Sequence, residues 1–116
     1  AGDRGMLGAL ALVLAASTAG ADGVATLCAE DGGSAEACAC AVEGLVGEIG
    51  QDEYALLHRL GFDLGDAVRR GRHPDDAWHE ALAAENARNP EPDAITTRRA
   101  EALRRAHRAH LGFCHR

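Results

Sequence analysis

The chain has 116 residues, which suffices for one domain and leaves no room for two domains of ordinary size. Its hydrophobic content of 47% comes largely from Ala, with one Trp, one Tyr, two Phe and one Met, so any core is poor in large side chains. The net charge of −6 argues against an autonomous nucleic-acid-binding protein, and we expect no nucleic acid as a partner. Small domains whose cores contain few large side chains usually need covalent cross-links such as disulfides.

The amino-terminal segment 1–21 has the order of residues found in an export signal. Arg4 precedes the apolar run MLGALALVLAA at 6–16, and small residues follow that run. Ala19 and Ala21 supply the two small positions of an A-x-A cleavage site. The sequence therefore predicts a signal peptide at 1–21.

Cleavage after Ala21 would leave residues 22–116 as a single small helical domain, periplasmic or secreted. A membrane anchor is disfavoured, because a spanning helix needs roughly 20 apolar residues and the run at 6–16 is shorter. We expect no stable membrane span after removal of the signal. A buried helix is the alternative interpretation of the run.

Turn residues and apolar spacings divide the rest of the chain into short helices, and no stretch has the period-two alternation of a strand. The sequence EDGGS at 30–34 predicts a turn in which Ser34 caps the helix that follows. Predicted helices occupy 35–49, 52–60, 63–70, 74–87 and 94–111. We expect Gly50, Gly61 and Gly71 to end the first three. The fold class is therefore all-α, a small bundle of about four helices.

Four cysteines follow the predicted signal, and they are Cys28, Cys38, Cys40 and Cys114. An even number of cysteines in a short exported chain is typical of a disulfide framework. Residues two apart on a helix point about 200° away from each other, so Cys38 and Cys40 need different partners. We expect two disulfides, one to Cys28 and one to Cys114.

Cys28 with Cys38 and Cys40 with Cys114 is the pairing that we favour. The first bridge spans the Gly-containing turn at 30–34. The swapped pairing, Cys28 with Cys40 and Cys38 with Cys114, fits the sequence nearly as well, so the pairing stays open.

Two further observations favour apposition of the first and last helices of the domain. Gly44 and Gly47 share the face of Cys40, and each costs about 1 kcal/mol of helix propensity relative to Ala, which a close approach of the last helix could offset. The segment 22–53 carries acids and no Arg, whereas 98–116 is rich in Arg and has Glu101 as its only acid. The two segments should therefore attract each other.

The arginines of the last predicted helix have two interpretations. A phosphate or an anionic lipid could bind them. We favour a solvated helix face, with Glu101 and Arg105 as an ordinary pair at i, i+4. The arginines in question are Arg98, Arg99, Arg104, Arg105 and Arg108.

Metal binding is the main alternative role for the cysteines. His107, His110 and Cys114 lie at i, i+3 and i+7 on one helix face, and His115 is adjacent. Imidazole and thiolate are ligands that copper and zinc accept, provided that the thiols stay reduced. We do not favour this set, because oxidising compartments consume thiols.

Thiol–disulfide exchange by Cys38 and Cys40 ranks third, since the spacing is not Cys-x-x-Cys. Hydrolytic catalysis is less favoured still. His79 and Glu80 begin an H-E-x-x-H motif, but Ala83 occupies the position of the second ligand.

The sequence thus predicts an exported, disulfide-stabilised protein with a non-enzymatic binding or accessory role. We expect it to be monomeric and to need no cofactor. Its partner, a protein or a small ligand, is not specified by the residues.

Overall fold

The computed structural model describes residues 22–115, which form helices and contain no strand. The predicted signal at 1–21 lies outside these residues. The all-α prediction is confirmed, with four helices in this part of the chain. They are α2 (Gly23–Glu30), α3 (Ala35–Arg69), α4 (Pro74–Arg88) and α5 (Asp93–Cys114).

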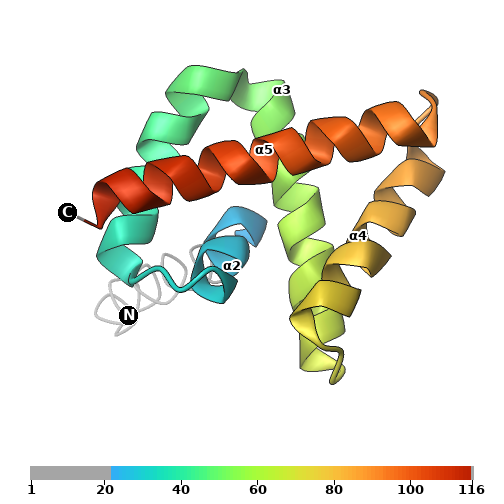
Figure 1. Cartoon of the computed structure of the whole chain (residues 1–116), viewed down its shortest axis with the longest axis horizontal. Coiled ribbons are helices and arrows are strands. Elements are labelled where there is room, and N and C mark those ends of the chain that lie inside the picture. Colours follow the sequence, from blue (N-terminus) through green and yellow to red (C-terminus); the bar gives the residue numbers. More distant parts are fainter. Residues whose placement is uncertain (1–21, 116) are drawn as a thin grey trace, which may run out of the picture.

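The long helix α3 is bent at Gly50 and packs against each of the other three described helices. Gly50 has φ 82° and ψ 172°, a left-handed backbone conformation that interrupts the helix. The break divides α3 into a first arm, 35–49, and a second arm, 51–69. Figure 1 shows α5 crossing both arms, α4 running beside the second arm, and α2 lying beneath α5. The predicted stop at Gly50 is therefore a bend between two arms.

Gly61 does not end a helix, so the prediction of separate helices at 52–60 and 63–70 was wrong. The second arm runs through Gly61, where α2 meets its backbone. A Cβ atom at Gly61 would lie 1.9 Å from the backbone oxygen of Gly23. Glycine is thus required here for close packing of two helices. Gly71, with φ 95°, does follow the end of α3 as predicted.

The helix α2 was not predicted from the sequence. Asp22 caps it, because its side chain accepts a hydrogen bond from the backbone N–H of Val24 at 2.9 Å. The predicted cap at Ser34 is confirmed, since its hydroxyl accepts from the N–H of Ala37 at 3.2 Å. Both helices α4 and α5 extend slightly beyond the predicted ranges.

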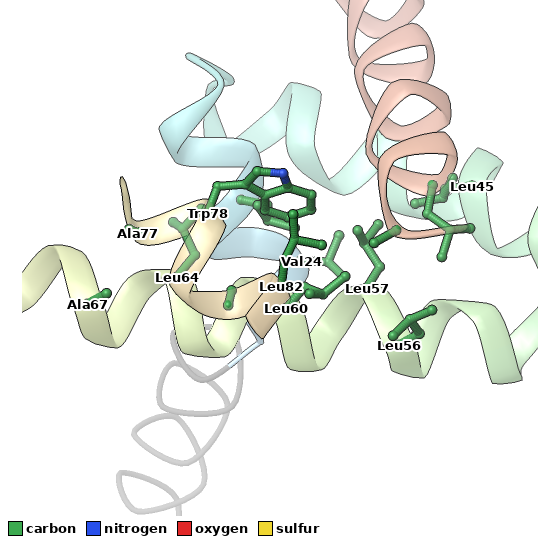
Figure 2. Packing of buried hydrophobic residues seen from close by; sticks show 14 residues of the cluster. Val24, Leu45, Leu56, Leu57, Leu60, Leu64, Ala67, Ala77, Trp78 and Leu82 are labelled. Atoms are coloured by element: carbon green, nitrogen blue, oxygen red, sulfur yellow. The ribbon is translucent and has the colours of Figure 1, made fainter. Parts of the chain in front are cut away.

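Leucines make up most of the core. Figure 2 shows Leu60 and Leu64 of α3 near Val24 of α2 and near Trp78 and Leu82 of α4. Trp78 is the only Phe, Trp or Tyr side chain among the buried residues of 22–115. Because the core contains few large side chains, the helices need additional interactions to hold them together.

Glu85 provides one such interaction between α4 and the second arm. Its side chain is 1% exposed and accepts hydrogen bonds from Arg59 at 3.2 and 3.0 Å, from Arg88 and from Asn89. Burial disfavours the charged carboxylate, but the bonds from Arg59 and Arg88 outweigh burial and hold the pKa of Glu85 below its ordinary value.

The contact between Gly23 and Gly61 is tested by adding one methyl group. We expect Gly61→Ala to lower the free energy of unfolding by about 1–3 kcal/mol, because the new Cβ meets backbone that moves only if α2 moves. Gly47→Ala in the first arm is the matched control, since its Cβ would meet nothing within 4 Å and should add up to about 1 kcal/mol of stability. Urea unfolding of the oxidised proteins, followed by circular dichroism, gives both values. Equal stability of the two variants would contradict the packing argument.

Candidate functional site

Two disulfides bind different helices to the first arm of α3. Cys28 pairs with Cys38 and joins α2 to α3, with 5.8 Å between the Cα atoms. Cys40 pairs with Cys114 and joins α5 to α3, with 5.9 Å between the Cα atoms. This is the first of the two pairings considered from the sequence. No cysteine of the chain is left free.

The glycines of the first arm differ in their surroundings. A Cβ atom at Gly44 would lie 2.6 Å from Nδ1 of His110, so α5 does approach closely at this point. Nothing lies within 4 Å of a Cβ atom at Gly47. The close-approach explanation therefore holds for Gly44 and was wrong for Gly47.

The structure does not bring the suggested metal ligands together. His107 is fully buried against the turn after α2, and Nε2 of His110 lies 2.6 Å from a carboxylate oxygen of Glu48. Cys114 is in a disulfide, and His115 is exposed at the end of α5. The shared face of α5 is therefore its packing face. Among residues 22–115 there is no group of three or more His, Cys, Asp or Glu side chains that could hold a metal ion.

Asp31, in the turn between α2 and α3, is the centre of a buried polar cluster. One of its oxygens accepts hydrogen bonds from Arg104 and from Arg108, each at 3.1 Å. Burial disfavours the charge of Asp31, but the two arginines outweigh burial and hold its pKa below the ordinary value. The guanidinium of Arg104 also lies 4.5 Å from the centre of the Trp78 ring, a cation–π contact.

This cluster corrects the interpretation of the arginines as a solvated face for Arg104, whereas Arg98, Arg105 and Arg108 are exposed as expected. Arg104 is only 11% exposed, and Arg99 pairs with Glu53 of α3 and with Glu91. The predicted attraction between acidic and basic segments therefore takes the form of specific ion pairs. The periodicity of α5 could not show this, because the partner acids lie in other parts of the chain.

His107 completes the polar cluster without a hydrogen-bond partner. Its side chain is 0% exposed, and Nδ1 lies 4.0 Å from the second oxygen of Asp31. Neither ring nitrogen has a partner within the part of the chain that the structure describes. Burial is the largest influence on His107 and lowers its pKa, although Asp31 opposes the effect.

Three open hollows lie around these features. The first, of about 410 Å³, lies between α4 and α5. Its lining contains arginines but also Asp75 and Glu101, and two of the arginines are already bonded to Asp31. The charge of this hollow therefore does not select an anion. The second, of about 650 Å³, lies between α2 and the first arm and is lined mainly by small apolar side chains. The third, of about 600 Å³, lies beside the Cys40–Cys114 disulfide. Its other lining residues are Glu43, Gly44, Glu48, Ala109, His110 and Phe113.

Comparisons of the chain with models of protein families, with curated proteins and with solved structures found no match. None of the helices in residues 22–115 has the length and apolar character needed to cross a membrane. The residues themselves must therefore carry any functional argument.

The buried imidazole of His107 makes the stability of the fold depend on pH. Because its pKa in the folded state is below the ordinary 6.5, the unfolded chain takes up the proton first as the pH falls. We expect the free energy of unfolding to decrease as the pH falls through 6.5, by at most about 1.4 kcal/mol per pH unit for this one proton. Urea unfolding between pH 7.5 and 5.5 measures the effect.

In the variant His107→Gln, the free energy of unfolding should depend less steeply on pH, because glutamine does not titrate. His79→Gln is the control, since it makes the same substitution at an exposed histidine of α4 outside this cluster. Asp31 titrates in a lower pH range, because its folded pKa is below 3.8, and does not obscure the comparison. An identical slope in His107→Gln and the unaltered protein would contradict the assignment.

Proposed function

We propose that the protein is exported and that it has a non-enzymatic binding or accessory role in an oxidising compartment. The observation that carries the proposal is the pair of disulfides, which fasten α2 and α5 to the first arm of α3. Cytosolic thiol systems keep such bonds reduced, whereas the periplasm and the extracellular space preserve them. In a domain with so thin a core, these disulfides add stability that the core alone supplies poorly.

The contacts of Asp22 are compatible with the expected cleavage after Ala21. Asp22, the first residue of the expected mature chain, is already attached to α3. Its carboxylate accepts a hydrogen bond from the hydroxyl of Tyr54 at 3.0 Å and lies 3.3 Å from Nδ1 of His58. Processing at this point would keep these contacts.

The lowered pKa values of the two buried acids have a structural cause. Strongly shifted pKa values often mark catalytic groups, but ion pairs that join structural elements cause them too. Asp31 and Glu85 both have lowered pKa values, and each is held by two arginines. Their chemistry is thus used to hold helices together. We expect the partner to be a protein or a small ligand and the protein itself to be monomeric.

Export is tested by producing the chain with its segment 1–21 in a Gram-negative host and analysing the periplasmic fraction. We expect a mature protein that begins at Asp22 and lacks the four hydrogens that two disulfides remove, as measured by amino-terminal sequencing and intact mass. All four cysteines should resist alkylation under native conditions.

Ala21→Arg should block processing, because the position before the cleaved bond must be small. Gly20→Arg is the matched control, because the middle residue of A-x-A is unrestricted and cleavage should continue. An unprocessed chain with free thiols in the cytosol would overturn the proposal. Free thiols that retain one zinc or copper ion per chain would instead favour the metal-binding alternative.

A further inference from the structure

The two disulfides differ in their access to solvent. Cys28 is 0% and Cys38 9% exposed. A Cβ atom at Gly33 would lie 2.7 Å from both sulfurs and 2.9 Å from the side chain of Leu111, so this bond is covered on the side of Gly33. Cys38 also lines the hollow of about 650 Å³, but little of its surface is exposed there. Cys40 is exposed and Cys114 is half-buried, and the hollow of about 600 Å³ opens beside their bond. A thiolate must reach a sulfur atom in order to exchange with it, so access favours the second bond.

We infer that the Cys40–Cys114 disulfide is a modification site at which small, positively charged thiols form a mixed disulfide with Cys40. The incoming thiolate bonds to Sγ of Cys40, which is the more exposed of the two residues. The bond between the two cysteine sulfurs breaks, and Sγ of Cys114 leaves with the electron pair as a thiolate. A second thiol that attacks the mixed disulfide releases the small-molecule disulfide and leaves both cysteines reduced, so the thiol supplies the two electrons.

The charges around the hollow give the site its selectivity. Glu43 and Glu48 both line it, and the imidazole of His110 is already bonded to Glu48. The remaining negative charge attracts a cationic thiol and repels an anionic one. Because the hollow is open to solvent, salt should weaken this preference.

Other contacts hold α5 against the fold when the Cys40–Cys114 bond opens, although the stability that this bridge contributes is then lost. Arg104 and Arg108 remain bonded to Asp31, and Arg99 remains bonded to Glu53 of the second arm. Leu111 still packs against the covered Cys28–Cys38 bond. Exchange therefore frees only the last turn of α5 and the adjoining surface of the first arm.

The site is tested with oxidised protein and 2-aminoethanethiol at low concentration, quenched with iodoacetamide and mapped by mass spectrometry. We expect the thiol on Cys40, the alkyl group on Cys114, and an unmodified Cys28–Cys38 bond. Circular dichroism should show that the helices persist. The variant Cys40→Ser/Cys114→Ser should take up no thiol under the same conditions.

Selectivity is tested by comparing the rates at which 2-aminoethanethiol and 3-mercaptopropionate open the Cys40–Cys114 bond. Each rate is corrected for the fraction of the thiol that is ionised and is then divided by the rate of the same thiol with a neutral model disulfide. We expect the cationic thiol to react about five-fold faster, from two carboxylates several ångströms away in a watery hollow. Glu43→Gln/Glu48→Gln should reduce this ratio to near one. Glu36→Gln, an exposed acid of the first arm that does not line the hollow, should leave it unchanged.

Reaction of Cys28–Cys38 as fast as Cys40–Cys114, or faster, would overturn the assignment of the site. A rate ratio near one in the unaltered protein would overturn its preference for cationic thiols. Neither outcome depends on export, because the experiment starts from oxidised protein.

Discussion

The arrangement of the helices depends on two cysteines that lie two residues apart on one helix. Cys38 and Cys40 point to different sides of the first arm of α3, so one binds α2 and the other binds α5. The Cys40–Cys114 bridge spans 74 residues, and chain-entropy arguments assign a loop of that size about 4 kcal/mol of stability. That is a large fraction of the stability that a small domain usually has.

Ion pairs between the helices, two of them centred on the poorly exposed carboxylates of Asp31 and Glu85, add to the disulfides in holding the fold together. Asp31 receives two arginines of α5, Glu85 connects α4 with the second arm, and Arg99 connects α5 with Glu53. These pairs lie at the edges of a core that contains leucine and alanine and one tryptophan. Removing the arginines of Asp31 or of Glu85 leaves a carboxylate without its partner in a poorly solvated place, so these pairs also specify how the helices meet.

Local sequence signals predicted the features that local physics controls. The cap at Ser34, the interruption at Gly50 and the helix beginning at Pro74 follow from backbone preferences of single residues. Gly61 and Arg104 could not be interpreted in this way, because each owes its role to a segment far away in the sequence. The Gly61 backbone meets α2, and the Arg104 guanidinium reaches Asp31 and Trp78. Of the candidate site, the spacing of the cysteines was informative, while the exposure of each bond emerged only from the packing of α5.

The most direct test of this account is a determination of the disulfide connectivity in the native protein. Fragmentation by electron transfer, after digestion under non-reducing conditions, can break the chain at Ala39 and so separate Cys38 from Cys40. The account predicts that Cys38 is linked to Cys28 and that Cys40 is linked to Cys114. Linkage of Cys28 to Cys40 and of Cys38 to Cys114 would contradict it, because α2 and α5 would then have to exchange the sides of the first arm on which they lie.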